Sequence, residues 1–378
     1  MKSYWKGAVK AEPDFGNLLK VLRRERPSRP TLFEFFLNDK LHAALAPEIA
    51  VKASHVSCAN DILRVTAYRN AGYDYAMAHV PGMGFPTRER EHKHGQTISQ
   101  NEGFVITDRK SFDAYQWPDP EVADYAFLDK LGEVVPKGMK LGVCGPGGVL
   151  ENVTSLLGYE NMCFMISDDP GLAWDVFEAV GTRLVKMYRN AVKSKSVGFI
   201  IGNDDWGFKS QTMLAPEQMR AYVFPWHKQI VEAAHEVGTP AILHSCGNLH
   251  SVMDDVIDTL KYDGKHSFED TIQPVEQAYE QYGKRIAILG GIDVDFICRS
   301  DPAAVHERAK AMVERAGNLG GYALGSGNSI PSYVPHEGYF AMIAAAVGER
   351  QEAPLDRRRP AHGMRRQAVA RMGGGQSF

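Results

Sequence analysis

The chain has 378 residues, of which 44% are apolar and 24% are charged, and its formal net charge is −3. This length and apolar content allow a large core, while a net charge near zero excludes a global basic field that would attract nucleic acid or an anionic membrane. The longest apolar run, residues 339–347, is far shorter than the ~18 residues of a membrane span, and residues 1–10 lack the apolar stretch of a secretion signal. We therefore expect a cytoplasmic protein with reduced cysteines. The cysteines are Cys58, Cys144, Cys163, Cys246 and Cys298.

Short apolar runs alternate with segments of helical length along most of the chain. Before the first run, residues 14–26 have the pattern of a short amphipathic helix, with Asp14 as its N-cap and Pro27 as its stop. The predicted strands are residues 32–36, 73–80, 141–144, 198–203, 241–244, 263–268, 285–289 and 322–324. The most legible helices between them are residues 170–193, 216–237 and 302–316.

Strands that alternate with helices predict a parallel sheet with crossover helices, and eight such units favour a closed (β/α)8 TIM barrel over an open sheet. We expect an N-terminal helical extension at residues 1–30, the barrel at residues 31–349, and a basic tail at residues 350–378. The tail is expected to be solvated, or alternatively to bind a partner or an anionic ligand. Residues 81–100 lack periodicity and are expected to form a long loop that can cover the barrel mouth.

The strongest chemical signal follows the predicted strand 241–244, where the sequence reads His244-Ser245-Cys246-Gly247. Side chains two apart on a strand point to the same face, so the histidine and the cysteine can converge at the C-terminal rim, where barrel enzymes keep their catalytic groups. Imidazole and thiolate together suit Zn²⁺, and a catalytic zinc needs one or two further ligands and an open position. The alternative is a packed cysteine beside a rim histidine.

Glu269 follows the next predicted strand, about 4.8 Å away in backbone spacing. It can act as a third metal ligand or as a general base, or it can be an ordinary carboxylate at a helix start.

Further polar residues at the strand ends are candidates for substrate contact or catalysis. Asp204 and Asp205 precede Trp206, and because successive strand side chains face opposite ways, we expect one of the two acids to enter the pocket. A loop turn or a helix cap is the alternative role for these acids. The other predicted substrate contacts are Asp293 after a pair of glycines, Asn328 in a glycine-rich turn that can present amides to an anion, and His79.

Together these strand ends resemble the uroporphyrinogen decarboxylase superfamily over roughly residues 29–349. The matching stretches are His244-Ser245-Cys246-Gly247, Gly290-Gly291-Ile292-Asp293, the turn 325–331 and Asp204-Asp205-Trp206. The resemblance implies a (β/α)8 barrel and two chemical branches. One branch is a decarboxylase that needs no metal, and the other comprises corrinoid-dependent methyltransferases that hold zinc on a His-x-Cys pair and a later cysteine.

The decarboxylase branch implies arginines after the first strand for the substrate's carboxylates. Residues 32–39 contain no arginine, so we do not expect uroporphyrinogen as the substrate. In the methyltransferase branch the His-x-Cys pair matches the first two zinc ligands, whereas Asn328-Ser329 stands where the third ligand, a cysteine, is expected. Glu269 or Cys144 can complete the shell, and a site with Glu269 would be harder and weaker than one with two cysteines.

We therefore predict a zinc-dependent methyltransferase that moves a methyl group between a corrinoid protein and a small methylated compound or thiol. The corrinoid-ligating pattern Asp-x-His-x-x-Gly is absent, so the corrinoid is expected on a separate partner. A metal-free decarboxylase that uses Asp204 or Asp205 is the alternative, with His79, Arg88, Arg90 and Lys93 as residues that can anchor a carboxylate. A non-enzymatic carrier of a corrinoid or tetrapyrrole is a third interpretation. The predicted metal ligands are His244, Cys246 and Glu269, the predicted catalytic residues Glu269, Asp204 and Asp205, and the predicted substrate contacts Asn328, Trp206, Asp293 and His79.

Overall fold

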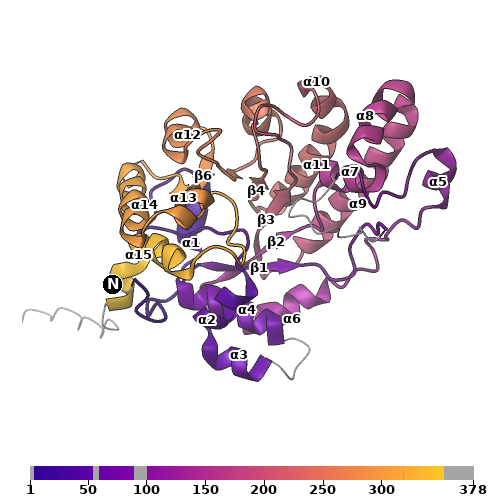
Figure 1. Ribbon diagram of the computed structural model, residues 1–378. Coiled ribbons are helices and arrows are strands. Elements are labelled where there is room, and N and C mark those ends of the chain that lie inside the picture. Colours follow the sequence, from indigo (N-terminus) through magenta and orange to yellow (C-terminus); the bar gives the residue numbers. More distant parts are fainter. Residues whose placement is uncertain (1–3, 54–58, 89–99, 318, 353–378) are drawn as a thin grey trace, which may run out of the picture.

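A computed structural model describes residues 4–53, 59–88, 100–317 and 319–352. Most of the predicted tail, much of the predicted loop 81–100, and Cys58 lie outside these residues. The centre of the described chain is a curled parallel sheet of seven strands in the order β1 to β7 (Figure 1). The strands are β1 (Tyr75–His79), β2 (Lys140–Cys144), β3 (Val197–Asn203), β4 (Ala241–His244), β5 (Gly264–His266), β6 (Ala287–Leu289) and β7 (Tyr322–Ala323).

The predicted strand 32–36 is reduced to a single bridge in the described chain. Leu32 pairs with Leu324 just beyond β7, where the Phe33 N–H donates to the Leu324 carbonyl at 2.8 Å. On the β1 side, the Tyr75 hydroxyl accepts the Glu34 N–H at 2.7 Å and donates to the Glu34 carbonyl at 2.6 Å. A side chain thus occupies the place of a backbone partner, so the described residues form a seven-stranded curl and not the fully paired eight-stranded barrel that the pattern predicted.

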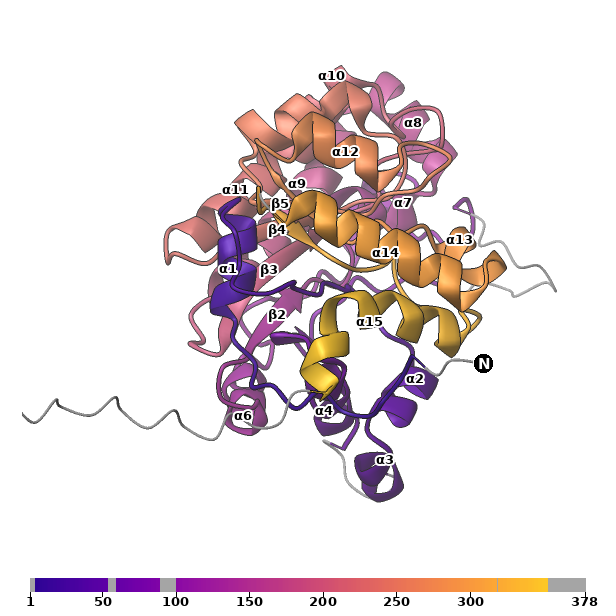
Figure 2. The same cartoon turned by 90° about the vertical axis from the view of Figure 1, so that its left-hand side faces the viewer.

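Helices cover the outside of the sheet, as two views at right angles show (Figures 1 and 2). The predicted helix 302–316 is confirmed as α14, which begins where the Asp301 carboxylate accepts the Ala303 and Ala304 amides. None of the described helices has the length and apolar character required to cross a membrane. The α-helices are α1 (Gly16–Leu22), α2 (Asp39–Leu45), α3 (Pro47–Ala53), α4 (Ala59–Ala71), α5 (Arg109–Ala114), α6 (Ala126–Val134), α7 (Val149–Leu157), α8 (Tyr159–Asp168), α9 (Pro170–Ala191), α10 (Pro216–Gln218), α11 (Phe224–His235), α12 (Val275–Tyr282), α13 (Val294–Arg299), α14 (Pro302–Ala316) and α15 (His336–Glu352). Shorter 3-10 and π segments are η1 (Met219–Val223), η2 (His250–Val252) and η3 (Asp255–Thr259).

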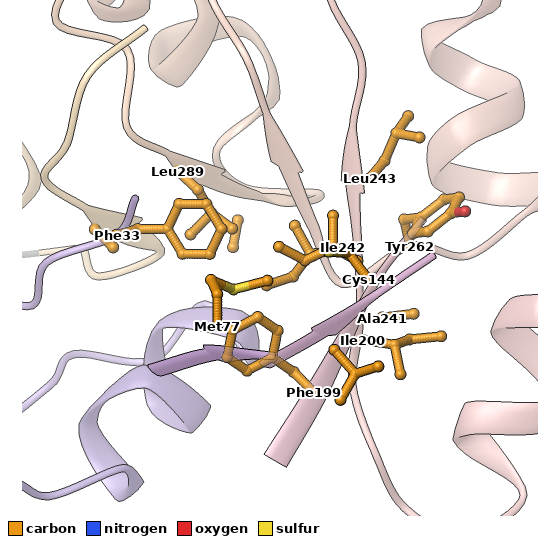
Figure 3. Close-up of a cluster of buried hydrophobic side chains, with 14 of the residues drawn as sticks. Phe33, Met77, Cys144, Phe199, Ile200, Ala241, Ile242, Leu243, Tyr262 and Leu289 are labelled. Atoms are coloured by element: carbon orange, nitrogen blue, oxygen red, sulfur yellow. The ribbon is translucent and has the colours of Figure 1, made fainter. Parts of the chain in front are cut away.

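The interior of the curl is filled by side chains from distant segments (Figure 3). The Phe199 ring of β3 lies 6.3 Å from the Phe33 ring and 5.0 Å from the Tyr75 ring, measured between centroids. Gly142 of β2 has no side chain because a Cβ there would lie 2.3 Å from the Phe199 ring and 2.9 Å from the Met77 sulfur. The interior of the curved sheet is therefore a packed core. Polar chemistry is left to the C-terminal ends of the strands.

Candidate metal centre

The C-terminal ends of the strands carry a layer of polar side chains. The register pairs His79 of β1 with Cys144 of β2, and it pairs His244 of β4 with both Asn203 of β3 and His266 of β5. Paired residues in a sheet share a face, so the register brings these side chains to one level of the barrel mouth.

Asp205, His244 and Cys246 form a group that can hold a metal ion, because their ligand atoms all lie within 4.8 Å of one another. The His244 Nε2 lies 3.9 Å from the Cys246 Sγ, and the Cys246 N–H donates to the Asp205 Oδ1 at 2.8 Å. Typical Zn–N and Zn–S bond lengths in a tetrahedral site put the two ligand atoms about 3.6 Å apart. The residues therefore fit a zinc ion after a small adjustment, with three protein ligands and one open position, which is the pattern of a catalytic site.

The imidazole of His244 is oriented by two rings. Its Nδ1 lies 2.8 Å from the Nδ1 of His266, and the Phe35 ring lies 4.3 Å from it between centroids. Burial, and then the neighbouring His266, hold the pKa of His244 below its usual range. The buried ring is neutral, which is the form that binds metals, and its Nε2 is the nitrogen that faces Cys246.

The Cys246 thiol is partly buried beside the Asp205 carboxylate. Burial, and then the Asp205 carboxylate, raise the pKa of this thiol. The Asn328 Nδ2 donates to its sulfur at 3.2 Å, and the Ser267 hydroxyl lies 3.8 Å away. A thiol of this kind becomes a thiolate when a cation is bound, as expected of a ligand and not of a free nucleophile. The structure thus brings Asn328 to the pair.

Glu269, predicted as the third ligand, lies outside this group. The prediction assumed pairing as far as residue 268, but β5 ends at His266, which lies opposite His244. The third member of the group is Asp205. Glu269 instead lines a cavity of about 760 Å³ together with Asn328 and Lys209.

The two adjacent acids have separate roles. Asp204 is fully buried, and its carboxylate accepts the Leu150 and Glu151 amides at the start of α7 and contacts the His227 Nε2 at 2.9 Å. Asp204 therefore takes the helix-cap role, while Asp205 lies beside His244 and Cys246.

Three predicted substrate contacts lie in structural positions. Trp206 is fully buried, with its ring 5.2 Å from the Phe224 ring between centroids, so its side chain does not face a ligand. Asp293 caps α13 by accepting the Phe296 amide at 2.9 Å, although it also lines the 760 Å³ cavity. The His79 Nδ1 lies 3.1 Å from the Cys144 Sγ. Cys144, the other proposed third ligand, therefore partners His79 and not His244.

Two buried ionisable residues in this region, Glu34 and Lys265, were not predicted from the sequence. Glu34 accepts both the amide and the hydroxyl of Ser326, at 2.6 and 2.8 Å, and burial raises its pKa to about 8. Burial lowers the pKa of Lys265 to about 8, and its ammonium donates to the carbonyls of Ser245 and Ser267. The available signal was a charged residue inside an apolar strand pattern.

The chain is similar to a known protein family. A model of the family "Uroporphyrinogen decarboxylase (URO-D)" matches residues 130–348, which is more than half of the chain and includes β2 to β7. The chain belongs to the uroporphyrinogen decarboxylase family. No curated protein sequence matches this family member significantly.

Two solved structures are similar to the chain at low sequence identity. A methyltransferase from Methanosarcina mazei has a TM-score of 0.61 and 15% identity, over 90% of this chain and 99% of that chain. A protein described as a vitamin-B12-independent methionine synthase from Listeria monocytogenes has a TM-score of 0.45 and 13% identity, over 86% of this chain and 99% of that chain. At 15% identity, the similarity between this family member and the Methanosarcina mazei structure supports a shared fold and nothing more.

Proposed function

We propose that the protein is a zinc-dependent methyltransferase that moves a methyl group between a corrinoid carried by a partner protein and a small methylated compound or thiol. The observation that carries this proposal is the group of Asp205, His244 and Cys246 at the barrel mouth. The shared fold with a protein described as a methyltransferase from Methanosarcina mazei supports it. In this proposal the segment 32–36 is the eighth unit of a TIM barrel.

The chain's own residues supply the ligands and their setting. The His244 Nε2, the Cys246 Sγ and an Asp205 carboxylate oxygen would hold the ion, and the Asn328 amide would stabilise the charge on the sulfur. A bound zinc ion would act as a Lewis acid that lowers the pKa of a thiol or polarises the heteroatom of a methyl donor. One thiolate with nitrogen and oxygen donors makes a harder site than one with two thiolates, so we expect moderate affinity for zinc.

The substrate would enter through the cavity of about 760 Å³ that Asn328 and Glu269 line. In the direction of thiol methylation, Glu269 would take the thiol proton as the thiol sulfur accepts the methyl group. A corrinoid on the partner protein would supply this methyl group and would keep the electron pair that the methyl group leaves behind. Glu269 would act as the proton acceptor, and its position on the lining of this cavity supports that role.

The alternative, a decarboxylase without a metal, has less support from the geometry. Asp204 is fully buried and already accepts two amides, so it has no access to a substrate. Residues 32–39 include the buried Glu34 and no arginine. A carboxylate-rich substrate would therefore find no cationic partner in this segment.

A chelator experiment separates the two activities. We expect the purified protein to demethylate free methylcobalamin in the presence of simple thiols, followed by the visible absorbance of the corrinoid. Dipicolinate should abolish this activity and added zinc should restore it, because the thiol is activated through the metal site. Methyl transfer that survives full removal of zinc would contradict the proposal, and release of CO₂ from carboxylic acids by the chelated protein would support the decarboxylase instead.

A further inference from the structure

We propose that His266 is a positioning residue that fixes the tautomer and the ring orientation of His244. It acts within a chain of hydrogen bonds that continues to Ser326 and Glu34. This inference rests on the proposed metal site, but the chain of contacts can be tested without a metal.

The tautomers of both histidines follow from the Ser326 carbonyl, at the fixed end of this chain of hydrogen bonds. The Ser326 carbonyl oxygen can only accept, and it accepts the Gly291 N–H at 2.8 Å and contacts the His266 Nε2 at 3.2 Å. The His266 Nε2 therefore carries a hydrogen, so in a neutral ring its Nδ1 is an acceptor. The His244 Nδ1, 2.8 Å away, must then be the donor. This leaves a lone pair on the His244 Nε2, the nitrogen 3.9 Å from the Cys246 sulfur.

Both rings lie in the interior, with exposed fractions of 6% for His244 and 0% for His266. Neither makes a hydrogen bond to a carboxylate within the described part of the chain, so a positive charge on either ring would be buried without a partner. The neutral pair is the arrangement that satisfies every hydrogen bond of the two rings.

Ser326, at the far end of this chain of hydrogen bonds, is held in place by the Glu34 side chain and by the space that Gly290 leaves. Glu34 accepts the amide and the hydroxyl of Ser326, which fixes the carbonyl that His266 contacts. A Cβ at Gly290 would lie 2.2 Å from the Ser326 oxygen and 2.9 Å from the His266 Nε2, so only glycine leaves room for this contact. The Phe33 ring packs edge-on against His266, with centroids 5.1 Å apart. The surroundings thus allow one orientation of the ring.

The first test uses the protein without metal. With ¹⁵N-histidine labelling, long-range ¹H–¹⁵N spectra should assign the hydrogen to Nδ1 in His244 and to Nε2 in His266. The His266→Phe variant keeps a ring in the cavity but removes the acceptor, so His244 should change to a mixture of tautomers or to the Nε2–H form. A His244 signal that stays purely Nδ1–H in this variant would overturn the proposal.

The second test measures Co²⁺ affinity by the visible absorption of the bound ion. We expect His266→Phe to bind Co²⁺ about 10- to 100-fold more weakly than wild type, the usual loss when the residue that orients a ligand is removed. His266→Gln should recover most of the affinity, because its amide offers an acceptor and a donor at nearly the same spacing as the two ring nitrogens. A merely structural role of His266 would not produce this recovery.

His42→Phe is the matched control, since His42 is also a buried histidine and lies in α2, away from the chain of contacts. It should leave both the His244 tautomer and the Co²⁺ affinity unchanged. Equal Co²⁺ affinity in wild type and His266→Phe would refute the role of His266. Failure of wild type to bind Co²⁺ would instead refute the proposed metal site, while the metal-free spectra would still decide the tautomers.

Discussion

Two histidine–cysteine pairs lie at the C-terminal ends of the strands, and their surroundings differ. The His79 Nδ1 and the Cys144 Sγ lie 3.1 Å apart, the distance of a direct hydrogen bond. The His244 Nε2 and the Cys246 Sγ lie 3.9 Å apart, with the Asp205 carboxylate as a third donor beside them. The two side chains of the first pair contact each other directly, whereas those of the second pair have the wider spacing that two ligands of one ion would have.

Residue type alone does not make a metal site. Cys144 is buried with its pKa raised to about 12, so it is an inert thiol. Cys246 receives the Asn328 amide and lies opposite a histidine whose other nitrogen is already occupied by His266. These neighbours, and not the pair of residue types, distinguish a ligand set from a packed contact.

The largest expected effect distinguishes the two cysteines directly. Cys246→Ala should weaken zinc binding about 100-fold or more, because each ligand contributes roughly 3 kcal/mol to a typical zinc site. Cys144→Ala should leave zinc affinity within about threefold of wild type, since this is the scatter of measurements on independent sites. Competition titrations with a chromogenic chelator measure both. Equal losses in the two variants would erase the distinction between the pairs.

The two adjacent acids give the next effect. Asp205→Asn should weaken zinc binding about 10- to 100-fold with little change in stability, because it replaces a charged ligand by a neutral one. Asp204→Asn should instead destabilise the fold by about 1–3 kcal/mol while zinc affinity is kept, because it disturbs a buried helix cap and the contact to His227. Urea unfolding and zinc titration of both variants test this division of roles. Loss of zinc affinity in Asp204→Asn and loss of stability in Asp205→Asn would contradict the assignment.

A smaller effect is expected from Asn328, which has no counterpart among the described hydrogen bonds of the first pair. Asn328→Ala removes the amide that donates to the Cys246 sulfur at 3.2 Å, so zinc affinity should fall about tenfold. Asn328→Ser, which keeps a donor, should lose less. Isothermal titration distinguishes the two variants, and an unchanged affinity in Asn328→Ala would show that the sulfur does not depend on this amide.

The smallest effect concerns the first pair and pH. Burial, and then Arg64, lower the pKa of His79 below its ordinary value near 6.5. The unfolded chain therefore binds this proton more readily, so the contribution of His79 to stability is present above pH 6.5 and is lost as pH falls below it. In His79→Gln, the free energy of unfolding should fall less between pH 7 and pH 5 than in wild type. We expect the difference to be less than about 1 kcal/mol, because the side chain is partly exposed. Urea midpoints at pH 7, 6 and 5 measure the slope, and a steeper loss in the variant would reverse the sign.

Much of the fold could be predicted from hydrophobic pattern and turn chemistry. Residues 241–244 are β4 and residues 302–316 are α14, with the same bounds as predicted, because apolar runs and caps are local signals. The segment 32–36 could not be placed from sequence, since the Tyr75 hydroxyl replaces a backbone partner that the pattern assumed.

The site was predictable in part for the same reason. The i, i+2 spacing of His244 and Cys246 is local, and strand alternation predicts that Asp204 and Asp205 face different ways. Asp204 is buried, and Asp205 lies beside His244 and Cys246. Which neighbour completes the group depends on where β5 ends, and β5 ends at His266, before Glu269. The chain from His266 to Glu34 joins residues far apart in sequence, so it becomes visible only when the strands are paired.

Zinc K-edge X-ray absorption of the zinc-loaded wild-type protein tests the central claim most directly. The account predicts one sulfur at about 2.3 Å and nitrogen or oxygen ligands at about 2.0–2.1 Å, with the sulfur lost in Cys246→Ser and kept in Cys144→Ser. A spectrum without sulfur, or one with two sulfurs, would contradict the assignment of Asp205, His244 and Cys246 as the metal centre.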